Sequence, residues 1–241
     1  MMKSIEDTQA GGDFFDLPDK SDYNLQSFLD KLPVNGKSSV PQGRTVLTFH
    51  YEDGAIVAGD RRIMAGSNLM FERCEKVIPI DNYSLMAVAG VPAIAFEISR
   101  ILSQYFEYYR RTQIRPMSLE GKIRTFSKLL KENLTASTSG LTRVSPIFAT
   151  YDIDSGKPSI YYYDMFGAEF QVLSFIATGA GAGHIRDVLE RENQWGPKPL
   201  AERCEKDAAV IAMKLLHVAV QIDNKQEMRF LTSKFILSWL R

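Results

Sequence analysis

The charged residues best placed to do chemistry stand at the ends of two apolar, strand-like segments. Asp60, followed by Arg61 and Arg62, ends the apolar run 55–59, and Lys76 opens a later segment. At an exposed sheet end such charges form solvated ion pairs. An aspartate and a lysine buried together would instead have perturbed proton affinities, as groups that assist nucleophilic attack often do. The sequence leaves both interpretations open.

A glycine-rich run, Thr178-Gly179-Ala180-Gly181-Ala182-Gly183, follows a strand-like segment and opens a helical one. Phosphate groups bind at such junctions in nucleotide-binding folds. The dinucleotide fingerprint, however, has a third glycine where this chain has His184, and the flanking strand-helix-strand context is missing. Close approach of the backbone at a strand-to-helix turn is therefore the favoured explanation of the run.

Candidate metal ligands and thiols are few and far apart in the sequence. No histidine or cysteine has a second one at metal-ligand spacing. We therefore expect no metal site and no cofactor, and we expect the cysteines to be reduced thiols. The residues concerned are His50, His184, His217, Cys74 and Cys204.

The elements that must position Asp60 and Lys76 are two β-hairpins. Residues 45–51 are rich in β-branched and aromatic side chains, Asp53-Gly54 is a tight-turn signal, and 55–59 resume the apolar run. A second pair of strands is expected at 76–80 and 84–89. Apolar residues at helical spacing then predict two consecutive helices, along 94–108 and 119–134.

Strands and helices return in the same grouping in the second half of the chain. Strands are expected at 144–153, 159–164 and 169–177, and helices at 183–192 and from Pro199 to about Ile222. Groups of strands that alternate with pairs of helices argue against strict βαβ alternation. The pattern predicts an α+β protein in which two antiparallel sheets pack face to face between helices, a four-layer αββα sandwich.

Residues 1–43 differ from the rest and are expected to form a flexible, acidic arm. Within the arm, Leu25, Phe28, Leu29 and Leu32 have the spacing of a short amphipathic helix. Residues 44–241 are expected to form one folded domain.

The overall charge is balanced, with 29 basic and 29 acidic residues, which disfavours nucleic acids and anionic membranes as partners. No apolar run approaches the roughly 18 to 20 residues of a membrane span, and the start lacks the apolar core of a signal peptide. These features favour a cytoplasmic protein.

Motifs in a fixed order from about residue 43 to residue 223 resemble the landmarks of proteasome β-type subunits, above all the bacterial ones. The motifs are Gly43-Arg44-Thr45-Val46, Ala58-Gly59-Asp60-Arg61-Arg62, Glu75-Lys76-Val77, Ala89-Gly90, Ala177-Thr178-Gly179 and Asp223. The resemblance implies an N-terminal-nucleophile hydrolase fold. It implies heptameric rings shared with other β-type subunits and stacked on α-type subunits, with unfolded polypeptides as substrates. Residues 1–43 then resemble a propeptide that is removed by self-cleavage after Gly43.

The resemblance also assigns roles to residues of this chain. In the family a threonine at the start of the mature chain attacks the peptide carbonyl, assisted by its own amino group. Asp60 and Lys76 occupy the positions of the family's aspartate and lysine beside that threonine, and Asp223 that of a further aspartate. The backbone N–H of Gly90 corresponds to the oxyanion hole. The substrate pocket would be lined by Ile63, Cys74, Ile78 and Val88.

The sequence departs from the family at the centre of this site. Counting without gaps from Asp60 and Lys76 places Arg44 on the nucleophile position, and Thr45 comes one residue later. In a strand, a shift of one residue turns a side chain to the opposite face. The glycine-rich turn has Ala180 where the family has a serine, and Asp223 lacks the hydroxyl residue and glycines that normally follow it. Residues 228–241 also match the family poorly, and the sequence offers no explanation for them.

Three hypotheses follow. The first is a proteasome β-type subunit that is non-catalytic or impaired because Arg44 replaces the nucleophile. The second is an active threonine endopeptidase that uses Thr45. The third, from another class, is a free-standing, non-enzymatic binding protein with the same fold.

Overall fold

The computed structural model describes residues 42–43, 45–65, 68–134, 144–164, 166–223 and 235–240. Only the backbone is described for residues 42–43, 133–134, 220–223 and 235–240. The internal contacts divide the chain between Gly36 and Lys37, and every described residue belongs to the second unit, Lys37–Arg241. The helix expected around Leu25 and Leu32 lies outside the described residues.

The larger sheet, sheet A, has eight antiparallel strands. Along its main path it runs β10 (Glu169–Val172), β9 (Lys157–Tyr163), β8 (Val144–Asp152), β7 (Ser84–Gly90), β1 (Gln42–Gly43), β4 (Ile63–Ala65) and β5 (Asn68–Phe71), while β6 (Val77–Asp81) also pairs with β7. The expected second hairpin is present as β6 and β7. Its turn is closed by Asp81 Oδ1, which accepts a hydrogen bond of 2.9 Å from the Tyr83 N–H.

The smaller sheet, sheet B, has four antiparallel strands in the order β11 (Phe175–Gly179), β2 (Thr45–Tyr51), β3 (Gly54–Asp60) and β12 (Phe235–Leu240). The central pair β2 and β3 is the hairpin predicted from the Asp53-Gly54 turn. Its register, with Val46 opposite Gly59 and Tyr51 opposite Gly54, has no irregularity.

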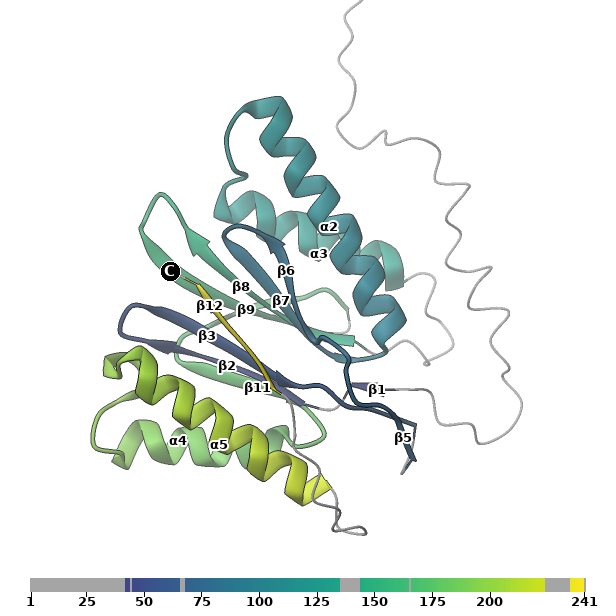
Figure 1. Cartoon of the computed structure of the whole chain (residues 1–241). Coiled ribbons are helices and arrows are strands. Elements are labelled where there is room, and N and C mark those ends of the chain that lie inside the picture. The colour runs from purple at the N-terminus through teal and green to yellow at the C-terminus, as the bar shows by residue number, and fades with distance from the viewer. Residues whose placement is uncertain are drawn as a thin grey trace, which may run out of the picture. The chain divides into compact units, whose positions relative to one another are not determined.

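Within the described residues, four α-helices cover the outer faces of the sheets. In Figure 1, α2 (Pro92–Gln113) and α3 (Leu119–Leu134) lie on sheet A, and α4 (Ala182–Trp195) and α5 (Glu205–Asp223) lie on sheet B. Helix α2 begins with a proline, which suits a first-turn position that needs no N–H donor. None of the described helices combines the length and the apolar content needed to cross a membrane.

Three apolar clusters fill the three spaces between four layers. One joins sheet A to α2 and α3 around Phe126 and Phe148, and one joins sheet B to α4 and α5 around Phe49 and Leu216. The third lies between the two sheets and consists mostly of small or β-branched side chains, such as Val57 and Ala87. The α+β, four-layer αββα fold is thus confirmed.

Some predicted elements differ in detail. Residues 169–177 form two strands rather than one, because the chain bends at Leu173–Ser174. Before the bend, β10 pairs with β9 in sheet A; after it, β11 pairs with β2 in sheet B. Residues 169–172 alternate in polarity and 175–177 are all apolar, and both patterns are typical of strands, so neither reveals the change of partner. The helix expected from Pro199 begins as a short 3-10 turn (Leu200–Glu202) before α5. Within the unexplained tail, Phe235–Leu240 is strand β12, paired with β3.

Candidate active site

Asp60, at the end of β3, and Lys76, just before β6, form a buried ion pair. Lys76 Nζ lies 2.7 Å from Asp60 Oδ1, and the two side chains are 3% and 5% exposed. Asp60 Oδ1 also accepts the Thr45 N–H at 3.0 Å, and Asp60 Oδ2 accepts the Arg62 N–H at 3.0 Å. Of the two interpretations left open by the sequence, the buried pair is therefore correct. The backbone donors from both sides fix the carboxylate, and the carboxylate in turn fixes the ammonium group.

Thr45 contacts this pair through its backbone, while its hydroxyl points elsewhere. Thr45 Oγ1 accepts a hydrogen bond of 3.3 Å from the Gly181 N–H. A Cβ built on Gly181 would lie 3.1 Å from Thr45 Oγ1 and 3.0 Å from the Cβ of Ala219, which belongs to the cluster under α4 and α5. The hydroxyl of Thr45 is therefore on the helix-facing side of sheet B.

The other face of the same strands is turned toward sheet A. Val46 belongs to the cluster between the sheets. A Cβ built on Gly59 would lie 3.1 Å from Val46 Cγ1 and 3.6 Å from Lys76 Cβ, so Lys76 and Val46 share that face. Because side chains alternate along a strand, Thr45 and its neighbour Val46 point to opposite faces of sheet B. Arg44 itself lies outside the described residues.

The glycine-rich run forms a tight turn between β11 and α4. Gly179 has a φ of 105°, a conformation that favours glycine. Gly181 is pressed against Thr45 and Ala219, so a larger residue there would force a shift. These contacts agree with close backbone approach as the reason for the glycines.

The short strand β1 lies between β4 and β7 in sheet A, with Gly43 opposite Ile63 on one side and opposite Gly90 on the other. Gly90, the expected oxyanion donor, has a φ of 128°, which disfavours any residue with a side chain. The residue expected to precede the cleavage point is therefore paired directly with the expected oxyanion glycine.

The four expected pocket residues come from different segments of the chain. Ile63 lies on β4, and the backbone N–H of buried Cys74 donates to the Arg61 carbonyl at 2.9 Å. Ile78 and Val88 pack in the cluster beneath α2 and α3. Burial raises the pKa of the Cys74 thiol above its ordinary value. The side chain of Asp223, the last residue of α5, is not among those described.

Sequence reasoning missed a second buried lysine. Lys122 of α3 is 2% exposed; its ammonium lies 2.8 Å from Asp81 Oδ2 and donates to Ser84 Oγ at 2.8 Å. A signal was present, because Lys122 lies three residues after Leu119 and four before Phe126, on the apolar face of the helix. The pair joins α3 to the turn between β6 and β7.

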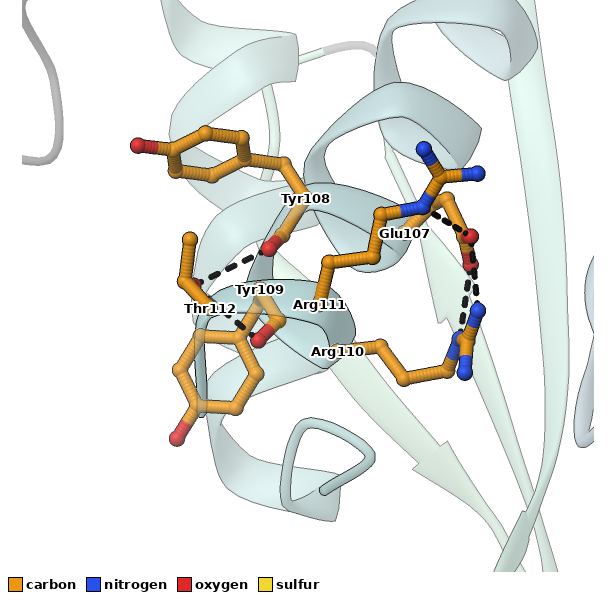
Figure 2. Close-up of polar contacts among 6 residues, drawn as sticks. All are labelled: Glu107, Tyr108, Tyr109, Arg110, Arg111 and Thr112. Atoms are coloured by element: carbon orange, nitrogen blue, oxygen red, sulfur yellow. Dashed lines mark hydrogen bonds and ion pairs between the residues drawn. The ribbon is translucent and has the colours of Figure 1, made fainter. Parts of the chain in front are cut away.

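Near its C-terminal end, α2 carries a charged cluster on its surface. Figure 2 shows Glu107 accepting hydrogen bonds from both Arg110 and Arg111, and these bonds hold the pKa of its carboxyl down at about 2. The helix then ends at Ile114, which is 91% exposed and has a φ of 54°. Among the described residues no group of three or more potential ligands could hold a metal ion.

The protein has two facing sheets between layers of helices, with an aspartate-lysine pair at the end of the second strand of the first hairpin. This fold is that of the N-terminal-nucleophile hydrolases. Comparisons with known proteins make this more specific. A family model described as "Proteasome subunit" matches residues 40–230. The chain therefore belongs to the proteasome subunit family, in agreement with the resemblance seen in the sequence.

Similar proteins include several bacterial β subunits. "Proteasome subunit beta" of Streptomyces griseus is 31% identical over 218 residues, which span 90% of this chain and 75% of that protein. "Proteasome subunit beta 2" of Thermomonospora curvata is 33% identical over 184 residues, 76% of this chain and 63% of that protein. "Proteasome subunit beta" of Jonesia denitrificans is 31% identical over 199 residues, which span 83% of this chain and 63% of that protein. These matches identify the bacterial β type, and the chain spans less than two thirds of the second and third relatives.

Proposed function

We propose that this chain is a non-catalytic β-type subunit of a bacterial proteasome core particle. The proteasome family takes part in protein degradation. In this proposal the chain supports degradation by completing rings with other β-type subunits, on which α-type subunits stack, in the cytoplasm. Catalytic neighbours would cleave the unfolded polypeptide substrates.

The observation that carries the proposal is the orientation of Thr45. Its hydroxyl accepts from Gly181 on the helix-facing side of sheet B, whereas Lys76 lies on the opposite face. The register of β2 is fixed on both sides, with Thr45 opposite Gly179 on β11 and Val46 opposite Gly59 on β3. Bringing the Thr45 hydroxyl to Lys76 would require a slip of one residue, which would move the whole apolar set of the strand to the wrong face.

Counting along the sequence from Asp60 and Lys76 assigns the nucleophile position to Arg44, whose side chain cannot replace a hydroxyl. A guanidinium group stays protonated at every physiological pH and offers no lone pair for attack. Loss of the nucleophile removes the covalent route entirely, so Asp60 and Lys76 cannot compensate. The preserved ion pair then serves the shape of the site.

The intact mass of the chain, purified after co-expression with an α-type partner, tests the proposal. We expect residues 1–43 to remain attached unless a neighbouring subunit trims them, and we expect no turnover of a fluorogenic peptide. Arg44→Thr, alone or with Ala180→Ser, should restore the hydroxyl and give a chain that begins at residue 44. Arg44→Ala is the matched control and should leave the chain uncut.

The main alternative is an active endopeptidase that uses Thr45. It predicts a mature chain that begins at Thr45 and peptide hydrolysis that Thr45→Ala abolishes. Either result for the unmodified chain would contradict the non-catalytic proposal. A free-standing binding protein is the third possibility, and light scattering coupled to size-exclusion chromatography would reveal it as a species that forms no ring.

A further inference from the structure

A small cavity lies between the connection of α2 to α3 and the turn that joins β8 to β9. Its volume is about 180 Å³, and its lining comes from residues 109, 115–119, 122 and 150–154. This volume is roughly that of six molecules of liquid water, whereas drug-sized ligands occupy pockets of about 300 Å³ or more. The cavity therefore has room for one small molecule of the size of a single amino acid.

The buried polar groups of the lining are already satisfied within the protein. The ammonium of Lys122 lies 2.8 Å from Asp81 Oδ2 and donates to Ser84 Oγ at 2.8 Å. Ser84 Oγ in turn lies 3.0 Å from Thr150 Oγ1. Lys122 and Thr150 are 2% and 1% exposed. These groups join α3 to sheet A, and their charges are balanced without a ligand.

Two charged side chains of opposite sign remain available at the cavity. Arg115 comes from the connection between the helices, and Asp154 comes from the turn between the strands. Among the described residues, neither the guanidinium of Arg115 nor the carboxylate of Asp154 forms a hydrogen bond or an ion pair. The other carboxylate of the turn, Asp152, accepts the Asp154 N–H at 3.3 Å and the Ser155 hydroxyl at 2.6 Å, so it is occupied within the turn.

This distribution of charge favours a ligand that carries both signs. An anion would be attracted by Arg115 and repelled by Asp154, and a cation would meet the reverse. A zwitterion satisfies both side chains and leaves no charge unpaired.

The cavity also offers an apolar surface. Pro116, Met117, Leu119 and Ile153 belong to its lining. Met117 is 8% exposed, whereas Ile153, on the turn, is 48% exposed and would be covered by an apolar group of the ligand. Burial of that surface would add to the affinity.

We propose that this cavity binds a free α-amino acid with an apolar side chain. Arg115 holds the carboxylate through its fork of N–H donors, and Asp154 accepts from the ammonium group. Met117 and Ile153 contact the side chain. Free amino acids are end products of protein degradation, the process in which the family takes part. The cavity does not involve Thr45, Asp60 or Lys76, so its binding of a ligand is independent of catalysis.

Isothermal titration calorimetry with L-leucine tests the proposal on the full chain co-expressed with its α-type partner. We expect saturable binding with a dissociation constant between about 10 μM and 1 mM, a range suited to a ligand of this size. Isocaproate is leucine without the amino group, and isoamylamine is leucine without the carboxylate. Each should bind at least about tenfold more weakly than leucine, because each leaves one charged side chain without its partner.

Two variants assign the binding to this cavity. Arg115→Ala and Asp154→Asn each remove one charge from an exposed position, so the fold should be unchanged. Each should weaken leucine binding at least about tenfold. Arg124→Ala and Asp187→Asn are the matched controls, because both residues are exposed and lie outside the cavity lining. They should bind leucine like the unmodified chain.

Three results would overturn the inference: no saturable binding of leucine, equal binding of isocaproate or isoamylamine, or unchanged leucine binding by either Arg115→Ala or Asp154→Asn. The proposed function is decided separately, by the intact mass of the chain and by peptide turnover. Failure of one proposal is therefore distinguishable from failure of the other.

Discussion

Asp60 is held in place by contacts that matter to the structure itself. Its two oxygens accept two backbone N–H groups and lie 2.7 Å from the buried ammonium of Lys76. A buried charge that loses its partner is costly, whereas the intact pair contributes little net stability. Such a pair is hard to lose one residue at a time, whether or not it takes part in catalysis.

Asp60→Ala should therefore destabilise the subunit strongly. The substitution leaves the Lys76 ammonium buried without the carboxylate, at a cost of about 3–5 kcal/mol in the free energy of unfolding. Urea denaturation measures the change. Glu75→Gln is the control, because Glu75 is 66% exposed and lies 3.7 Å from Arg61, so it should cost less than about 1 kcal/mol. Similar losses of unfolding free energy in both variants would mean that burial does not make the loss of this ion pair more costly.

At the scale of elements, the sequence predicted those whose signals are local. The Asp53-Gly54 turn and the flanking apolar runs were sufficient for β2 and β3, and helical spacing was sufficient for α2 and α3. Strands β1 and β5 were not predicted, because both are short. Strand β1 depends on pairing with the distant residues Ile63 and Gly90, whereas β5 pairs locally with β4. All four residues of β5 are exposed, so no burial pattern marks it.

The candidate site, too, could be predicted from the sequence only in part. Asp60 and Lys76 could be placed together from the family resemblance, but their burial could not, since it depends on the packing of both sheets. Lys122 was overlooked although it lies on the apolar face of α3, because a charged residue there is usually taken as the edge of that face. Its partners, Asp81 and Ser84, come from another part of the chain.

The C-terminal end of α2 offers a test of backbone strain. Ile114 adopts the left-handed conformation, which disfavours β-branched residues, and its side chain is 91% exposed, so little packing would be lost on truncation. Ile114→Gly should raise the free energy of unfolding by about 1 kcal/mol. This gain is the relief of backbone strain minus the cost of the extra conformational freedom that glycine has in the unfolded chain.

Thermal and urea unfolding would measure this gain. Ile114→Ala is the matched control, because it removes the exposed side chain but keeps the Cβ that causes the strain. An equal gain in Ile114→Ala would show that the exposed side chain, and not the backbone conformation, is responsible.

At the scale of the whole molecule, the layers depend on each other. The cluster between the sheets takes Val57 from sheet B and Ala87 from sheet A, and it is filled mostly by small or β-branched side chains that let the sheets approach closely. The bend at Leu173–Ser174 carries the chain directly from one sheet to the other. The site at Asp60 and Lys76 lies where β3 and β6, from the two sheets, meet.

The pairing of β12 with β3 has a consequence for the order of synthesis. Sheet B needs Phe235–Leu240 beside a strand made near the start of the folded unit. Contacts between residues far apart in sequence slow folding and leave strand edges exposed in the meantime. A nascent chain stalled on the ribosome with only the residues up to Asp223 emerged should therefore be cut by protease within β3, whereas the released chain should resist. Sheet B would thus be completed only once Phe235–Leu240 has left the ribosome, and until then β3 lacks one of its two neighbouring strands.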